Sequence, residues 1–167
     1  MVKTVTEYRV FIGSPGGLEA ERSAFRDTLD RFNRDSARHH DVRFEPVGWE
    51  DTVAGAGRPQ KKINEDLAQC DYAIFLFHDR WGSPSGDDGR VGTEEEWHLA
   101  EHHYSEAGGR KMREIAIYFK DVAEAQTRDP GPQYQKVLDF KKKLFAEKKH
   151  LCGKFVHETG FVEHVRA

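Results

Sequence analysis

Residues 71–77, Asp-Tyr-Ala-Ile-Phe-Leu-Phe, form the most hydrophobic stretch of the 167-residue chain. After the leading aspartate, the run contains no charged residue and no alternation between polar and apolar positions. Such a run is typical of a strand that is buried on both faces, as in a parallel sheet covered by helices on each side. The stretch therefore predicts a parallel sheet between two helical layers.

The segments around this strand alternate between the hydrophobic periods of strands and helices. Further strands are predicted at residues 8–12, 42–47, 115–119 and 152–156. Pro46 is tolerated only if the strand at 42–47 lies at an edge of the sheet. Helices are predicted at residues 18–41, 59–67, 97–107, 134–145 and 161–165. This alternation predicts a three-layer α/β fold of the flavodoxin-like kind, an open parallel sheet of about five strands with helices on both faces.

The composition restricts the broad class of the protein. Its length suits one domain, so residues 1–167 are predicted to form a single domain, and the abrupt end at 160–167 suggests the N-terminal part of a longer protein. The net charge of −3 disfavours nucleic-acid binding, and the chain lacks the 18 consecutive apolar residues of a membrane span. Cys70 and Cys152 are too few for a disulfide framework, so we expect a cytoplasmic protein.

Two glycine-rich loops are predicted at the edge of the sheet where ligands bind in this fold class. In an open parallel sheet this edge lies beyond the carboxyl ends of the strands, near the point at which strand order reverses. Residues 13–17 follow the first strand, and residues 78–92 follow the third. Gly13 and Ser14 form either a simple turn or a ligand contact. The sequence contains neither a G-x-G-x-x-G motif in this loop nor a P-loop motif.

The second loop carries the more informative side chains. Trp81, followed by Gly82 and Ser83, lies in a polar segment, where its indole either stacks on a base or packs beneath the loop. Thr93 and Glu96 have the spacing of a capping box, in which the two side chains only complete the start of a helix. The alternative is that Glu96 presents its carboxylate to a ligand.

Neighbouring acids and histidines offer weaker candidates. Glu94 lies about 200° from Glu96 around a helix, so the two side chains cannot face the same ligand. Glu95 is expected to face solvent. His98 and His102 share a helix face, but there is no H-E-x-x-H motif and no evident third ligand, so no metal site is predicted.

Residues 10–22, Val-Phe-Ile-Gly-Ser-Pro-Gly-Gly-Leu-Glu-Ala-Glu-Arg, resemble the opening of the TIR-like domains at the N-termini of bacterial STAND-type NTPases. Those domains typically begin with a strand, then Ser-Ser-Pro-Gly-Asp-Leu, then Glu-Arg. The resemblance continues through residues 71–77, 80–83 and 93–96, and the order of elements matches over residues 8–165. It implies a TIR-like form of the flavodoxin-like fold.

Residues 92–100, Gly-Thr-Glu-Glu-Glu-Trp-His-Leu-Ala, are similar to the active-site stretch of nucleoside 2-deoxyribosyltransferases. On this alignment the catalytic glutamate of that family falls on Glu96, and Leu99 stands where a tyrosine is usual. The NAD-cleaving glutamate of TIR domains occupies an equivalent place. The first loop departs from the TIR-like pattern, because Gly13 replaces the first serine and Gly17 replaces the aspartate.

These resemblances imply an NAD⁺-cleaving N-glycosidase effector domain in bacterial antiphage immunity, with Glu96 as its catalytic carboxylate. The implied substrate contacts are Gly13, Ser14, Trp81, Gly82, Ser83 and Thr93. NAD⁺ is then the substrate, with no separate cofactor and no metal, and self-association of the domain is expected. The alternatives are a non-catalytic self-association and signalling module, an N-glycosidase of another nucleoside or nucleotide, and a nucleotide-binding sensor.

Overall fold

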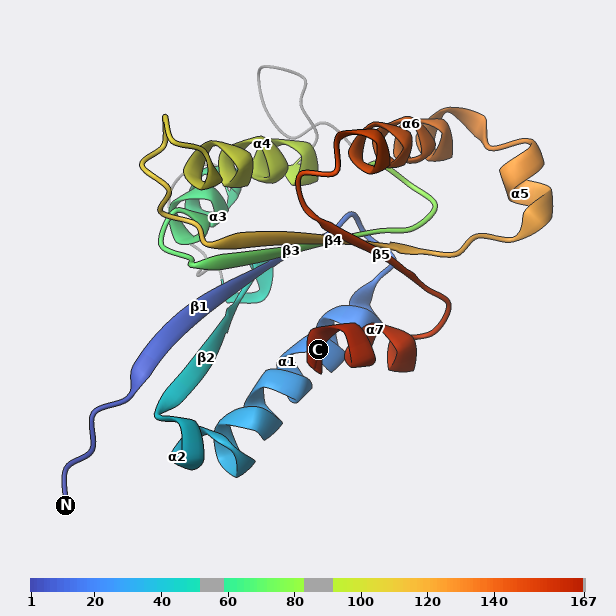
Figure 1. The fold of residues 1–167 in the computed structure, drawn as a ribbon. Helices are drawn as coiled ribbons and strands as arrows, with labels where there is room; N and C mark the ends of the chain where they lie inside the picture. Colours follow the sequence, from blue (N-terminus) through green and yellow to red (C-terminus); the bar gives the residue numbers. More distant parts are fainter. Residues whose placement is uncertain (52–58, 83–91, 167) are drawn as a thin grey trace.

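A computed structural model describes residues 1–51, 59–82 and 92–166, and its centre is one five-stranded sheet (Figure 1). All the strand pairs are parallel, and the order across the sheet is β2-β1-β3-β4-β5. The strands are β1 (Thr6–Gly13), β2 (Val42–Val47), β3 (Tyr72–Phe77), β4 (Glu114–Lys120) and β5 (Leu151–Phe155). The predicted open parallel sheet of the flavodoxin-like class is therefore confirmed, and Pro46 lies on an edge strand as expected.

Helices cover both faces of the sheet, which gives the predicted three layers. Figure 1 shows α1, α2 and α7 on one face and α3, α4 and α6 on the other. The helices are α1 (Glu19–Asp35), α2 (Ala37–His40), α3 (Pro59–Leu67), α4 (Gly92–Tyr104), α5 (Glu124–Arg128), α6 (Gly131–Glu147) and α7 (Glu158–Arg166). A short 3₁₀ helix, η1 (Trp49–Asp51), follows β2.

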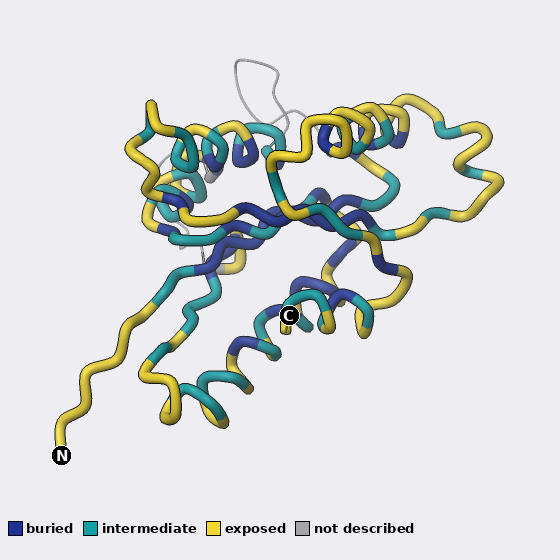
Figure 2. The backbone as a smooth tube through the Cα atoms, viewed as in Figure 1, coloured by how far each residue is buried: buried dark blue, intermediate teal, exposed yellow. Residues whose placement is uncertain are grey.

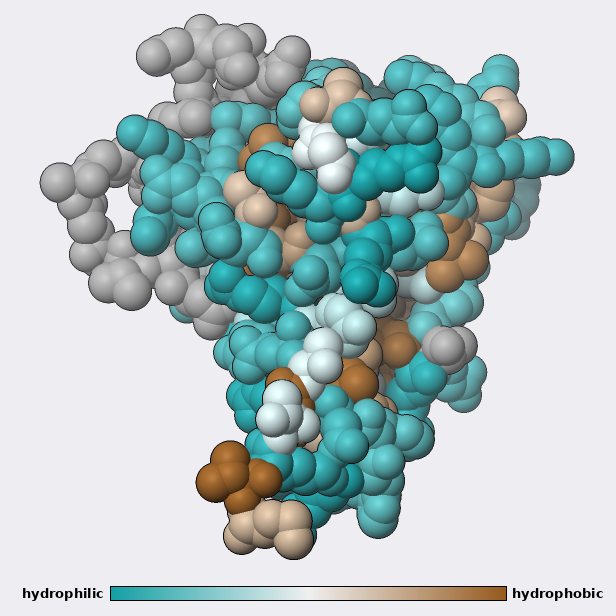
Figure 3. Space-filling view, turned by 60° about the vertical axis from the view of Figure 1, so that its left-hand side comes forward, coloured by the Kyte–Doolittle hydropathy of each residue, from teal (hydrophilic) through white to brown (hydrophobic). Residues whose placement is uncertain are grey.

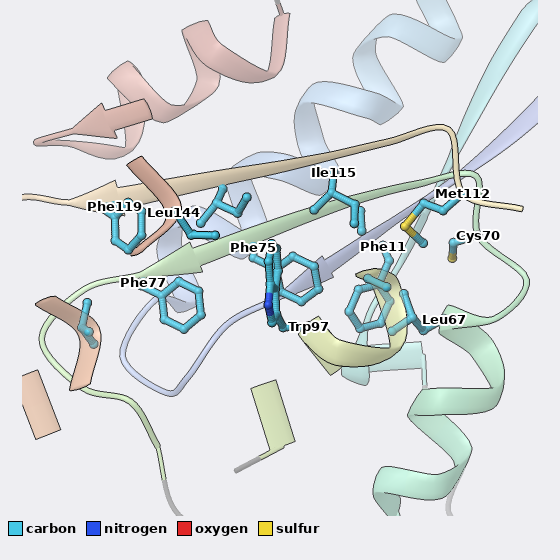
Figure 4. Close-up of a cluster of buried hydrophobic side chains, with 14 of the residues drawn as sticks. Phe11, Leu67, Cys70, Phe75, Phe77, Trp97, Met112, Ile115, Phe119 and Leu144 are labelled. Carbon is cyan, nitrogen blue, oxygen red and sulfur yellow. The ribbon is translucent and has the colours of Figure 1, made fainter. Parts of the chain in front are cut away.

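The central strand β3 explains why its sequence is continuously apolar. Ala73, Phe75 and Phe77 point into the hydrophobic cluster beneath α3, α4 and α6. Leu76 belongs to the cluster beneath α1 and α7, so alternate residues of one strand enter two separate cores. Figure 2 shows the middle of the sheet as buried, and Figure 4 shows Phe75 and Phe77 beside Trp97 of α4.

Helical segments differ from the sequence-based expectation at several places. The helix predicted at 18–41 is divided at Ser36 into α1 and α2. The helix predicted at 97–107 begins earlier, at Gly92, and ends at Tyr104, after which Ser105 donates both its amide and its hydroxyl to the carbonyl of His102. The helix α5 at Glu124–Arg128 was not predicted, because its residues lack an apolar stripe and are mostly exposed.

The face of the molecule drawn in Figure 3 is mostly hydrophilic. Figure 3 shows hydrophobic residues on one face only in small groups among hydrophilic ones. In the described parts of the chain, no helix is long and apolar enough to cross a membrane. Cys70 and Cys152 are both free thiols, in agreement with the absence of a predicted disulfide framework.

Candidate functional site

The order of the strands reverses between β1 and β3, and ligands of open parallel sheets bind beyond the carboxyl ends of the strands at such a point. Strand β1 lies between β2, which follows it in the chain, and β3, which pairs with its opposite edge. The helices that follow these strands, α1 and α4, lie on opposite faces of the sheet (Figure 1). Connections that diverge in this way leave space for a ligand between the strand ends. Gly13, the last residue of β1, is paired with Phe75 at this position.

The carboxylate of Glu96 is buried beside the end of β1. The residue lies on the first turns of α4 and is only 7% exposed. Its Oε1 accepts a hydrogen bond of 3.0 Å from Nε2 of Gln60, which belongs to α3. A Cβ atom added to Gly13 would lie 2.8 Å from Oε2 of Glu96 and 2.9 Å from the ring of Phe75. Glycine at the end of β1 is thus what allows the carboxylate to lie against the backbone.

The surroundings of Glu96 disfavour its charged form. Burial raises the pKa of Glu96 to about 7, although the hydrogen bond from Gln60 and the charge of Arg22 oppose the rise. Near neutral pH the side chain therefore exists in both protonation states. A carboxyl group with such a pKa can donate or accept a proton, and when ionised it can stabilise a nearby positive charge.

A buried arginine links the first loop to η1. Arg22 of α1 donates from Nη1 to Oγ of Ser14 at 3.1 Å, and from Nε and Nη2 to the Glu50 carboxylate at 2.5 and 2.9 Å. Burial by itself would raise the pKa of Glu50, but its bonds to Arg22 outweigh burial and lower that pKa. Arg22 therefore fixes Ser14 and η1 together. Sequence reasoning assigned Arg22 no role, although it is the arginine of the Glu-Arg pair in the TIR-like motif.

The exposed aromatic ring near this network is Trp49. Its side chain belongs to η1, at the carboxyl end of β2, and the residue is 54% exposed. The guanidinium carbon of Arg22 lies 5.7 Å from the centre of the indole ring. This cation–π contact covers part of the ring and leaves the rest open to solvent. Trp49 escaped the sequence analysis because it stands between a strand and a glycine-rich segment without a recognisable motif.

Trp81 adopts the packing alternative and not the stacking one. Its ring is 9% exposed, stacks on Phe77 at a centroid distance of 5.3 Å, and meets Phe140 of α6 edge-on. Its Nε1 donates to Glu94 at 3.3 Å, and its amide donates to Gln133. The indole is thus part of the core, and it presents no free face to a base.

The other predicted contacts are distributed around the same edge. The amide of Gly82, like that of Trp81, donates to Oε1 of Gln133, at 2.9 Å. Ser83 lies outside the described residues. Thr93 is buried as the second residue of α4, and no bond from its amide to Glu96 occurs among the described residues. The capping-box alternative for Glu96 therefore receives no support from the geometry.

The two acids beside Glu96 point in other directions. Glu94 accepts from Trp81, as described above, so it does not share the environment of Glu96. The expectation that Glu95 faces solvent was wrong, because its Oε1 accepts a hydrogen bond of 2.9 Å from Nδ2 of Asn64. This bond ties α4 to α3 directly beside the Gln60–Glu96 bond. Two neighbouring amides of α3 therefore hold two neighbouring carboxylates of α4.

The histidines of α4 do not converge. Nε2 of His98 lies 3.8 Å from Glu94, whereas His102 and His103 lie at the other end of the helix with ring centroids 5.6 Å apart. Within residues 1–51, 59–82 and 92–166, no three histidine, cysteine, aspartate or glutamate side chains are placed to hold a metal ion.

Comparisons with known proteins give a family but no activity. A crystal structure of a protein described as NADPH-quinone reductase, from P. pentosaceus, aligns over 97% of this chain and 96% of its own, with 11% sequence identity and a TM-score of 0.38. A search of curated proteins finds no match. A family model described as "Domain of unknown function (DUF4062)" matches residues 9–167. The chain therefore belongs to the DUF4062 family.

Proposed function

We propose that this protein is a TIR-like domain that hydrolyses the N-glycosidic bond of NAD⁺, acting as an effector in bacterial antiphage immunity. The observation that carries the proposal is the burial of the Glu96 carboxylate where β1 and β3 end. That edge is where ligands bind in open parallel sheets. The sequence resemblance to TIR-like domains and to nucleoside 2-deoxyribosyltransferases points to the same residue.

The chemistry follows from the charge that develops when the bond between ribose C1′ and the base nitrogen breaks. The transition state is oxocarbenium-like, with positive charge on the sugar. An ionised Glu96 stabilises that charge, and in a site shielded from water such an interaction is strong. The positive charge in turn lowers the pKa of the carboxyl group, so the ionised form is favoured as the reaction proceeds. Nicotinamide leaves readily, because its ring nitrogen is cationic in NAD⁺ and neutral after departure.

Two described side chains have suitable positions to assist. Gln60 already donates to Oε1 of Glu96, and a ribose hydroxyl is a chemically equivalent donor that can replace or accompany it. Trp49 offers the exposed ring that Trp81 does not, with Arg22 beside it. An aromatic platform of this kind suits stacking with a nucleobase or with nicotinamide.

The test is nicotinamide release from NAD⁺ by the purified domain, both concentrated and artificially clustered. Glu96→Gln keeps the shape of the side chain and should lower the rate by roughly 10²–10³-fold, as for the loss of one stabilising group. Glu95→Gln is the matched control, because the neighbouring acid makes the same kind of bond to an α3 amide but does not lie against Gly13. Circular dichroism checks that each variant is folded. Full activity in Glu96→Gln would remove Glu96 from the mechanism.

A non-catalytic self-association module is the second candidate. It is favoured by the exposed apolar side chains around the edge strand β5, where Leu151 and Val156 are exposed and Phe145 of α6 is nearby in sequence. An unpaired strand edge is a ready surface for a second copy. Concentration-dependent association of a folded protein, with no turnover in any clustered form, would favour this function. Saturable NAD⁺ binding without cleavage would instead indicate a nucleotide sensor.

A further inference from the structure

A cavity lies at the opposite end of α4 from Glu96. It has a volume of about 700 Å³ and is formed where α4 ends at Tyr104, where the chain enters β4 and where it enters β5. Its walls include Met112 and Arg113 before β4, and Lys149 and His150 before β5. Because these residues precede their strands, the cavity is at the amino ends of the sheet. It is therefore separate from the Glu96 site at the carboxyl ends.

The charges around this cavity do not balance. Of the acids that line it, Glu101 has its Oε1 3.2 Å from Nε2 of His150, and Glu106 is paired with Arg110 at 2.5 Å. In the described parts of the chain, neither Arg113 nor Lys149 makes an ion pair with a carboxylate, and both are exposed, with the Arg113 guanidinium 5.1 Å from the centre of the Tyr8 ring. Three cations and two carboxylates therefore line the cavity, and the one positive charge in excess favours an anion.

The inner wall of the cavity is apolar and aromatic. Met112 is almost completely buried, and the ring of Tyr104 meets that of His150 at a centroid distance of 5.0 Å. The His150 side chain is 2% exposed, and its Nδ1 is buried without a hydrogen-bond partner in the described structure. A buried polar atom without a partner is uncommon in folded proteins. The wall of the cavity thus offers a ligand mainly apolar and aromatic contact.

We propose that this cavity binds a small aromatic anion, with its phosphate or carboxylate group at Arg113 and Lys149 and its ring against Tyr104 and Met112. The two cations supply the electrostatic attraction, and the recessed wall supplies apolar contact for a planar group. The proposal does not depend on NAD⁺ cleavage, because none of these side chains takes part in the Glu96 site.

The experiment uses phenyl phosphate as the probe, with inorganic phosphate and phenol as its two halves. Amide shifts in ¹H–¹⁵N spectra of the labelled protein report the location, and their saturation gives each Kd. Phenyl phosphate should bind about tenfold more tightly than either half, since a tenfold gain needs only about 1.4 kcal/mol. The largest shifts should fall on residues 104–113 and 149–150. Shifts confined to other residues, or equal binding of inorganic phosphate, would overturn the proposal.

Charge variants distinguish this site from general attraction to a basic surface. Lys149→Gln should weaken phenyl phosphate binding about fivefold to tenfold. Lys136→Gln removes an equally exposed lysine from α6, outside the cavity, and should leave the Kd unchanged. Arg113→Gln provides an independent second variant with the same expected weakening. Glu96→Gln should also bind the probe normally, because Glu96 lies at the other end of α4. Equal weakening by Lys149→Gln and Lys136→Gln would refute the assignment.

Discussion

Replacing Glu96 by glutamine should make the protein more stable at alkaline pH. Burial raises the pKa of Glu96 from 4.5 to about 7, so the folded protein holds this proton at pH values where the unfolded chain has lost it. Between these two pKa values the folded state binds more protons than the unfolded state. The contribution of Glu96 to stability is therefore greatest below about pH 4.5 and is lost as the pH rises through about 7.

The size of the effect follows from the difference between the two pKa values. One pKa unit corresponds to about 1.4 kcal/mol, so ionised Glu96 lowers the free energy of unfolding by about 3 kcal/mol. Glutamine is nearly isosteric, stays neutral, and its side-chain oxygen can still accept the bond from Gln60. Glu96→Gln should therefore be about 3 kcal/mol more stable than the wild type near pH 8.5, and less than about 1 kcal/mol more stable near pH 5.

Urea unfolding followed by tryptophan fluorescence at these two pH values measures the difference directly. The buried rings of Trp81 and Trp97 should report the loss of packing. Glu163→Gln, at an exposed position of α7, is the control and should change stability by less than about 0.5 kcal/mol at either pH. If Glu96→Gln were no more stable than the wild type near pH 8.5, the carboxylate would be stabilised by its surroundings, and its pKa could not be raised.

Four further predictions concern the Glu96 site and its surroundings. If NAD⁺ cleavage uses the ionised form of Glu96, kcat/KM should rise about tenfold per pH unit below about 7 and level off above it, as a pH–rate profile would reveal. Gly13→Ala should lower the free energy of unfolding in urea by about 1–3 kcal/mol, because the added Cβ crowds Glu96. Gly16→Ala is the control and should have little effect, because the nearest atom to a Cβ at that position is 4.0 Å away. Trp81→Ala should cost about 3–5 kcal/mol of stability in urea unfolding. Trp49→Ala should leave stability within about 0.5 kcal/mol and raise the KM for NAD⁺, and a large loss of stability would show that its ring is structural.

The fold could be predicted because its main signals are local. The run at 71–77 fills both cores of the sheet, so its lack of polar alternation reports burial on two faces without knowledge of any partner. Pro46 excluded a central position for its strand, and the edge position of β2 agrees. The end of α4 was placed too late because Ala107 continues the apolar spacing, whereas the helix ends at Tyr104 and Ser105 bonds the carbonyl of His102. This local turn has no signal in the apolar spacing.

The candidate site could be predicted only in part, because its geometry depends on contacts between distant segments. Glu96 was selected through resemblance, but the bond from Gln60 joins residues 36 positions apart and has no signature in the sequence. Trp49 and Trp81 illustrate the same limit. Both stand just after strands in polar surroundings, and Trp81 is buried by packing against Phe77 and against Phe140 of the distant α6.

The cost of burying Glu96 is itself an argument that the carboxylate has a chemical role. If its task were only to bond Gln60 and fill the space beside Gly13, glutamine would perform it without the loss of about 3 kcal/mol at neutral and alkaline pH. A helix-capping glutamate would instead bond the Thr93 amide, and no such bond occurs in the described residues. Ionising a buried carboxyl group at this edge of the sheet is unfavourable. A positive charge beside it stabilises the carboxylate and offsets most of that cost. An approaching oxocarbenium-like sugar supplies such a charge, whereas a purely structural role for Glu96 gives no reason to keep a carboxylate at this position.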